Sequence, residues 1–204
     1  MSSYVRKGVD LRRICVFCGS SDSVPSAYLE AAAEIGELLA ERGITIVFGG
    51  GSTGLMGALA NAALAAGGRV IGVLPRIFNT PALAHAGLTE LELVDGMHER
   101  KARMAELADG FIALPGGFGT FEELFEVLTW AQIGLHHKPV GVLNIDGYFD
   151  PLLALIAHAG DQGFIYAEHQ QLLANDREPA GLLRSMEDYQ PPEGLARWVD
   201  RGGE

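Results

Sequence analysis

Basic residues are scarce in this sequence, which limits the partners that the chain can bind. The 204 residues include 15 Lys and Arg against 26 Asp and Glu, a formal net charge of −11. A nucleic-acid backbone or an anionic membrane surface attracts proteins through clustered positive charge. The composition therefore argues against nucleic acid and membrane as main partners, and an anionic ligand must find local positive charge.

Long apolar runs are missing as well. No stretch approaches the roughly 20 apolar residues of a membrane-spanning helix, and the first ten residues lack the apolar core of a secretion signal. We therefore expect a cytoplasmic protein. The length and the 48% apolar composition fit one domain over residues 1–204, with its core at about 13–187.

Cysteine is limited to Cys15 and Cys18, whose C-x-x-C spacing suggests redox or metal chemistry. Both lie in a β-branched and aromatic run that predicts a strand, where residues three apart point to opposite faces, roughly 10 Å apart. Such a pair can neither close a disulfide nor share a metal. We expect two buried thiols, and no histidine or carboxylate cluster has the spacing of a metal site.

Short apolar runs alternate with longer helical patterns along the chain, which is typical of a parallel sheet covered by helices on both faces. The predicted strands are residues 12–18, 44–48, 69–74, 90–94, 111–114 and 139–144. A helix is predicted between the first two strands, and others at 53–66, 97–108, 120–134, 150–159 and 178–187. The fold class is therefore α/β, a doubly wound, Rossmann-like parallel sheet that binds ligands at the carboxyl ends of its strands.

Two glycine turns follow the first two predicted strands. Gly19 and Ser20 end the first strand, but both are also ordinary turn residues. Residues 48–57 (FGGGSTGLMG) contain G-x-G-x-x-G, in which Gly50 and Gly51 would let backbone N–H groups approach an anion. A dinucleotide site is disfavoured because no acidic residue follows about 20 positions later to bind a ribose. Phosphate or ribose contact is favoured over a purely structural turn.

The third turn, residues 114–123 (LPGGFGTFEE), follows a buried strand and opens a helix. Its candidate phosphate ligands are Gly116, Gly117, Gly119 and Thr120. The apolar face of the helix is predicted to consist of Phe121, Leu124, Phe125 and Leu128. Thr120 to Glu123 also spells a T-x-x-E capping box, in which both side chains would merely satisfy helix-end donors. The residue types leave a functional role and a capping role for Glu123 equally open.

Residues 97–103 (MHERKAR) open another helix and place cations near its start, where the helix dipole favours Asp and Glu. A bound phosphate would compensate, with Arg100 supplying a guanidinium fork and Lys101 a point charge. The alternative is a solvated basic face that pairs with Glu99 and Glu106.

These motifs together resemble the Lonely Guy (LOG) family of cytokinin riboside 5′-monophosphate phosphoribohydrolases. The resemblance is carried by Gly49 to Gly51, by M-H-x-R-K at residues 97–101 and by P-G-G-x-G-T-x-x-E at residues 115–123, and it runs from about Arg13 to about Glu187. The family was formerly labelled lysine decarboxylase, but no lysine here is placed as an evident Schiff-base residue.

The resemblance implies hydrolysis of the N-glycosidic bond of an N6-substituted adenosine 5′-monophosphate to free base and ribose 5-phosphate. It assigns Arg100 and Glu123 as the catalytic pair, with no metal or other cofactor. The 5′-phosphate would be held by Gly117, Gly119 and Thr120. Contacts near the ribose and base would come from Lys101, Glu122 and Thr129. The remaining substrate-binding residues would be Gly19, Ser20, Gly50, Gly51, Met97 and Gly116. The family also implies a homodimer whose site is completed across the interface.

Two alternatives stay open. Family members usually carry a glutamate in the loop after the third strand, where this sequence has Ala82, so a general AMP nucleosidase is one alternative. A non-catalytic nucleotide carrier or sensor of the same fold is the other, since it would share the glycine turns but would not need a positioned carboxylate.

Overall fold

The computed structural model describes residues 8–195. Seven parallel strands form one sheet in the order β4-β3-β2-β1-β5-β6-β7. The strands are β1 (Arg13–Phe17), β2 (Thr45–Phe48), β3 (Val70–Pro75), β4 (Glu90–Val94), β5 (Gly110–Ala113), β6 (Val140–Leu143) and β7 (Leu173–Asp176). The chain runs outward from β1 to β4 and then returns to the other side of β1 with β5. This order confirms the predicted doubly wound α/β fold.

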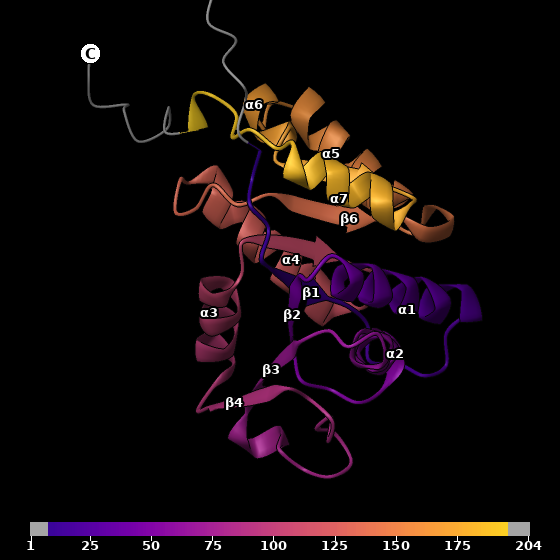
Figure 1. The fold of residues 1–204 in the computed structure, drawn as a ribbon. Coiled ribbons are helices and arrows are strands. Elements are labelled where there is room, and N and C mark those ends of the chain that lie inside the picture. Colours follow the sequence, from indigo (N-terminus) through magenta and orange to yellow (C-terminus); the bar gives the residue numbers. More distant parts are fainter. Residues whose placement is uncertain (1–7, 196–204) are drawn as a thin grey trace, which may run out of the picture.

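Helices cover both faces of the sheet (Figure 1). They are α1 (Ser26–Glu41), α2 (Gly54–Ala65), α3 (Met97–Leu107), α4 (Phe118–Gln132), α5 (Asp150–Asp161), α6 (Ala167–Gln170) and α7 (Pro179–Glu187), with short 3₁₀ turns at Arg76–Phe78 and Ile145–Gly147. Buried side chains of α1, α2 and α7 share one apolar cluster, and those of α3 and α4 share another. The sheet therefore lies between two helical layers.

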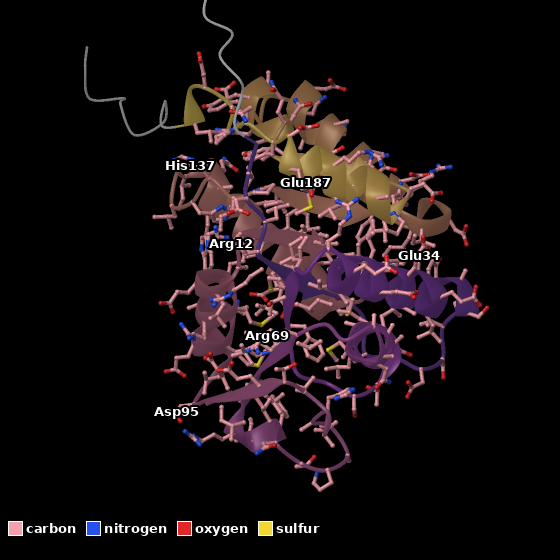
Figure 2. All side chains as sticks on the ribbon, viewed as in Figure 1. Arg12, Glu34, Arg69, Asp95, His137 and Glu187 are labelled. Atoms are coloured by element: carbon pink, nitrogen blue, oxygen red, sulfur yellow. The ribbon has the colours of Figure 1, made fainter. Side chains whose placement is uncertain are left out.

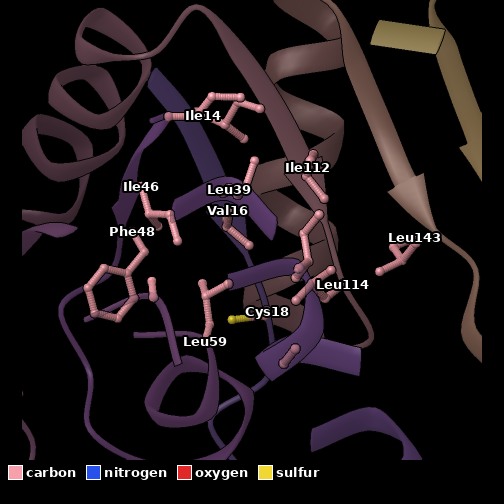
Figure 3. Packing of buried hydrophobic residues seen from close by; sticks show 14 of the residues in the cluster. Ile14, Val16, Cys18, Leu39, Ile46, Phe48, Leu59, Ile112, Leu114 and Leu143 are labelled. Carbon is pink, nitrogen blue, oxygen red and sulfur yellow. The ribbon is translucent and has the colours of Figure 1, made fainter. Parts of the chain in front are cut away.

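The central strands are buried on both faces, as their nearly continuous apolar sequences predict. Val16 of β1 pairs with Phe48 of β2 on one side and with Ile112 of β5 on the other. Figure 3 shows these side chains packing with Leu39 of α1 and Leu59 of α2. Cys18 joins this cluster while Cys15 joins the cluster on the opposite face, and both are free thiols, as predicted.

The ends of α1 follow from local sequence. Pro25, with φ of −52°, immediately precedes the helix, where its fixed φ suits the first turn. Gly43 follows the helix with φ of +69°, a left-handed conformation that glycine adopts without steric cost. The Gly43 N–H and the Ile44 N–H donate to the carbonyls of Ala40 and Leu39. The chain therefore turns directly from α1 into β2.

Two elements were missing from the sequence prediction. The four-residue strand β7 is only partly buried and ends in Asn175 and Asp176, so it lacks the apolar run that identified the other strands. The helix α6 also has only four residues, too few to show a helical period. In addition, α4 begins at Phe118 rather than at residue 120.

The outer surface carries the charged side chains that the composition leads one to expect. Figure 2 shows Glu34, Asp95 and His137 at the periphery, and all three are exposed. Among the helices of the described residues, none is long and apolar enough to cross a membrane.

The contact between α1 and α2 depends on Gly36. A Cβ at this position would lie 2.4 Å from the carbonyl oxygen of Leu59. Alanine favours a helix by about 1 kcal/mol over glycine, but overpacking typically costs about 1–3 kcal/mol, and here the clash is with backbone. We predict that Gly36→Ala lowers the free energy of unfolding by about 1–2 kcal/mol, measured by urea denaturation. The neighbouring exposed Glu37→Ala should change it by less than about 0.5 kcal/mol. A G36A variant as stable as the wild type would contradict this contact.

Candidate functional site

The three glycine turns meet at one edge of the sheet, because β2, β1 and β5 are adjacent and parallel. The Gly19 N–H donates to the Pro115 carbonyl at 3.0 Å, which joins the first turn to the third. The Leu55 N–H donates to the Gly19 carbonyl at 3.0 Å, which joins the first turn to the start of α2. The expected common edge is thus confirmed, and it lies where the strand order reverses between β1 and β5.

Gly19 and Gly116 are required by the packing of these turns. A Cβ at Gly19 would lie 3.2 Å from the Gly116 Cα. A Cβ at Gly116 would lie 2.1 Å from the Thr120 Oγ1. These two glycines therefore have a structural reason within the chain, and a substrate contact for them stays a prediction.

At Gly117 and Gly119, no packing among the described residues requires glycine. A Cβ at either position would have no atom of the described residues within 4 Å, and both residues are exposed. Neither has a positive φ. The protein itself therefore does not demand glycine at these positions, whereas a ligand approaching the backbone closely would.

The start of α4 is an uncapped helix N-terminus. The helix begins at Phe118 with Gly117 as N-cap and no side-chain hydrogen bond to the cap from the described residues. The N–H groups of the first helical turn have no intrahelical acceptor, so they can bind an anion. Thr120 lies inside this turn and not at the N-cap, so the capping-box interpretation of Thr120 and Glu123 is wrong.

The buried face of α4 also differs from the prediction. It consists of Thr120, Glu123, Leu124, Val127 and Ala131. Phe125, assigned to the apolar face, is 41% exposed, and Phe118 is 93% exposed. The sequence pattern misplaced this face because a threonine and a glutamate occupy buried positions that an amphipathic helix normally fills with apolar residues.

The second glycine turn, in contrast, uses its donors within the protein. The Gly54 N–H at the start of α2 donates to the Asp22 Oδ1 at 2.7 Å, and the Ser52 N–H donates to the Leu83 carbonyl at 3.0 Å. Gly50 has φ of +76°, which explains its glycine. These contacts favour the structural interpretation of the turn, and substrate contact by Gly50 and Gly51 remains a prediction.

Arg100 and Glu123 meet beside these turns. The Arg100 Nη1 lies 2.7 Å from the Glu123 Oε1, and the two side chains are 12% and 10% exposed. The Arg100 Nε donates to the Val73 carbonyl at 3.2 Å. A Cβ at Gly49 would stand 2.0 Å from the Arg100 Nη2, so the first glycine of the second turn makes room for the guanidinium. The structure thus joins α3, α4, β3 and the second turn through one ion pair.

Burial raises the pKa of the Glu123 carboxyl, because removal from water disfavours its charged form. The charge and the hydrogen bond of Arg100 act in the opposite direction but do not cancel this effect. Glu123 is therefore an acid whose pKa is higher than that of an ordinary glutamate, held in a defined orientation. Such a group is suited to accept a proton.

Lys101 forms a second link between α3 and α4. Its buried Nζ contacts the Glu122 carboxylate and lies 3.0 Å from the Glu126 Oε1. Burial lowers the Lys101 pKa, but its hydrogen bonds to Glu122 and Glu126 outweigh burial, and the net shift is upward. The interpretation of a solvated basic face is therefore wrong for Arg100 and Lys101, which pair with α4.

Of the other predicted substrate-binding residues, some lie at the glycine turns and others lie away from them. Ser20 lines a cavity of about 300 Å³ together with Gly19, Gly116 and Gly117. Met97, the first residue of α3, is 47% exposed. Thr129 is exposed, donates to the Phe125 carbonyl at 2.6 Å, and lines a different hollow near α6. The structure brings Ser20 to the glycine turns but leaves Thr129 outside this group.

Sequence reasoning missed several residues that shape the site. Asp22 caps α2, Glu126 binds Lys101, and Tyr148 donates a hydrogen bond to the Gly116 carbonyl. Glu126 follows Glu122 by one helical turn, so this i, i+4 spacing could have identified it as a second carboxylate partner for Lys101. Asp22 and Tyr148 lie in loops, where sequence offers no period to follow. Within residues 8–195, no group of three or more His, Cys, Asp or Glu residues could hold a metal ion.

Comparison with known proteins identifies the family. A family described as "Possible lysine decarboxylase" matches residues 56–186. The chain is 49% identical over 177 residues to the probable cytokinin riboside 5′-monophosphate phosphoribohydrolase LOGL1 of Oryza sativa subsp. japonica, covering 87% of this chain and 79% of that protein. It is 48% identical over 180 residues to the cytokinin riboside 5′-monophosphate phosphoribohydrolase LOG7 of Arabidopsis thaliana, covering 88% and 83%. The chain belongs to the LOG family.

A solved structure supports the fold of this LOG-family chain. The molybdenum cofactor binding protein of Rippkaea orientalis superposes with a TM-score of 0.65 at 22% identity, covering 84% of this chain and 93% of that one. At this identity the likeness concerns the fold alone.

The decarboxylase label does not fit the chemistry of the site. A Schiff-base lysine must be neutral to attack a carbonyl, and its pKa is normally lowered by desolvation or a neighbouring cation. Lys101 instead contacts two carboxylates, and its pKa is raised. This LOG-family chain therefore holds Lys101 as a cation.

The Glu123 pKa gives a direct test of the site geometry. We predict that its carboxyl titrates above an ordinary glutamate and that Arg100→Met raises the pKa further, because the two effects of Arg100 that lower it disappear. The pKa of Glu123 is higher in the folded chain than in the unfolded chain. Its contribution to stability is therefore present below the unfolded pKa and is lost as pH rises through the folded pKa. ¹³C NMR titration of the side-chain carboxyls measures both proteins. Glu92, whose pKa is lowered by its hydrogen bond to Arg103, should titrate alike in both. An unchanged or lower Glu123 pKa in the variant would contradict the pairing.

Proposed function

We propose that this chain hydrolyses the N-glycosidic bond of N6-substituted adenosine 5′-monophosphates and releases a cytokinin base and ribose 5-phosphate. The proposal is supported by the relatives at 48–49% identity, whose names give this activity and whose matches cover most of the chain. The observation that carries it is the buried Arg100–Glu123 pair lying beside the uncapped N-terminus of α4.

The 5′-phosphate binds at the start of α4 in this proposal. The backbone N–H groups from Gly117 to Thr120 supply donors, and the helix dipole favours the negative charge. The open space at Gly117 and Gly119 supports close approach of the phosphate. Glu123 lies about 7.5 Å further along the helix axis, five residues from Phe118 at about 1.5 Å each. A ribose would lie between the phosphate and the carboxylate.

Glu123 acts on the bond at C1′. As the C1′–N bond breaks, its electron pair leaves with the base, and positive charge develops on the ribose ring. The Glu123 carboxylate stabilises this oxocarbenium-like state and accepts a proton from the water whose oxygen bonds to C1′. The departing base takes up a proton from solvent water, and Glu123 returns its proton to solvent, so that one water is added across the C1′–N bond and the carboxylate is regenerated. Arg100 orients the carboxylate and contributes positive charge toward the substrate anion.

We also propose that the functional unit is a homodimer. The outer face of α4 carries Phe118, 93% exposed, and Phe125, 41% exposed. Thr129 lies on the same side of the helix, one further turn along. A second copy that covers this face would bury both phenylalanines and bring Thr129 into the interface, in keeping with the family resemblance, which implies a homodimer whose site is completed across the interface. Cytoplasmic location also remains a prediction.

The requirement for the phosphate tests the substrate class. We expect cleavage of N6-isopentenyl-AMP to free base and ribose 5-phosphate, with kcat/KM at least about a hundredfold above that of the corresponding nucleoside, since the nucleoside cannot use the α4 N-terminus. Product analysis by chromatography measures both substrates, with AMP alongside. Equal kcat/KM for AMP and N6-isopentenyl-AMP would favour the general AMP nucleosidase. Equal kcat/KM for the nucleotide and the nucleoside would contradict binding of the phosphate at the α4 N-terminus.

Glu123→Gln tests the catalytic assignment. The substitution keeps the size of the side chain but removes the charge and the proton acceptor. We expect kcat to fall at least about a hundredfold, with folding and AMP affinity largely retained. The matched control is Glu106→Gln, which removes the surface partner of Arg103 on the same helix as Arg100 and should leave kcat within about twofold. Wild-type turnover in E123Q would refute the assignment and favour the non-catalytic carrier.

A further inference from the structure

The loop that follows β6 reaches the third glycine turn through Tyr148. The Tyr148 hydroxyl donates a hydrogen bond to the Gly116 carbonyl, which lies 32 residues earlier in the chain. Gly116 and Gly117 are consecutive glycines, so the peptide between them has unusual rotational freedom. The hydrogen bond from Tyr148 therefore restrains a peptide group that joins two residues without side chains.

The orientation of this peptide decides where the Gly117 N–H points. In a trans peptide the carbonyl and the following N–H lie on opposite sides of the chain. The Gly116 carbonyl points to Tyr148, so the Gly117 N–H points away from it. That N–H has no hydrogen-bond partner among residues 8–195. It therefore adds one free donor next to those of the first turn of α4.

Tyr148 is itself held firmly from several directions. Its ring lies edge-on to Tyr28 of α1 at 5.7 Å and stacks with Phe121 of α4 at 6.5 Å between centroids. Phe149 contacts it edge-on at 5.1 Å. A ring packed between two helices has little freedom to move, so its hydroxyl remains in place to bind the carbonyl.

The loop behind Tyr148 is fixed by Asn144, a buried residue 3% exposed. Its side chain donates to the Asp150 Oδ1 at 2.7 Å and accepts from the Phe149 N–H at 2.7 Å. The turn between them includes Asp146 with φ of +50° and Gly147 with φ of +73°. A network of this kind, which includes a strained non-glycine residue, holds one loop conformation.

We propose that Tyr148 is a positioning residue for phosphate recognition. Its hydroxyl orients the Gly116–Gly117 peptide so that the Gly117 N–H joins the α4 N-terminus as a donor to the phosphate. This role rests on the proposed function for the identity of the ligand, a nucleoside 5′-monophosphate. It concerns the phosphate, because the Tyr148 hydroxyl acts through the backbone of the third turn.

Tyr148→Phe tests the proposal, since it removes the hydroxyl and keeps the ring contacts. We expect the affinity for AMP, measured by calorimetry, to fall roughly tenfold, as for loss of one well-aligned hydrogen-bond donor. The affinity for adenosine should change by less than about twofold. The matched control is Tyr189→Phe, which removes a tyrosine hydroxyl just beyond the end of α7, away from the glycine turns, and should leave both affinities unchanged. Equal weakening of AMP and adenosine, or no weakening of either, would overturn the role of Tyr148.

A second readout avoids dependence on turnover and on the stability of the variant. In ¹H–¹⁵N NMR spectra of the wild type, inorganic phosphate should shift the Gly117 amide signal, and in Y148F this shift should be much smaller at the same occupancy. A Gly117 shift that is as large in the variant would refute the proposal. Wild-type protein that binds N6-isopentenyl-AMP but releases no base from it would refute the proposed function instead, and the affinities would still decide the role of Tyr148.

Discussion

The buried ion pair between Arg100 and Glu123 joins the two halves of the doubly wound sheet. Arg100 comes from the helix after β4, at one edge of the first half, and Glu123 from the helix after β5, which opens the second. A buried ion pair of this kind seldom adds net stability over packed apolar residues, although breaking it by removing one partner costs about 3–5 kcal/mol. The presence of this pair between α3 and α4 is therefore better explained by chemistry than by stability.

The distribution of charge around this pair reconciles an acidic chain with an anionic substrate. The net charge of −11 suggests that a phosphate needs a local group of cations. The structure gives Arg100 and Lys101 carboxylate partners on α4 instead. Among the described residues, the start of α4 offers backbone N–H groups without a side-chain cap, and these carry partial positive charge whatever the net charge of the protein. Recognition through backbone also explains why glycine, rather than lysine, dominates the third turn.

Sequence reasoning placed the sheet and the edge where the glycine turns meet, because those features depend on local signals. Apolar runs identified six strands, and their parallel arrangement required the turns after β1, β2 and β5 to meet. The prediction of the site was wrong where tertiary contacts, rather than local sequence signals, determine the structure. Glu123 fits a capping box by spacing, yet α4 begins two residues earlier and Glu123 faces Arg100. Asp22 and Tyr148 act across long sequence separations from loops, and no periodicity or propensity can reveal such contacts in one sequence.

The capping of α2 by the loop after β1 has a consequence for how the substrate arrives. Asp22 and Gly19 hold the start of α2, the second turn leads into that helix, and its Gly49 packs against the Arg100 guanidinium. The groups around the ion pair are thus joined by contacts of the protein itself. A preorganised site loses little conformational entropy on binding. Association would then be governed by diffusional encounter and access rather than by a slow rearrangement of the protein.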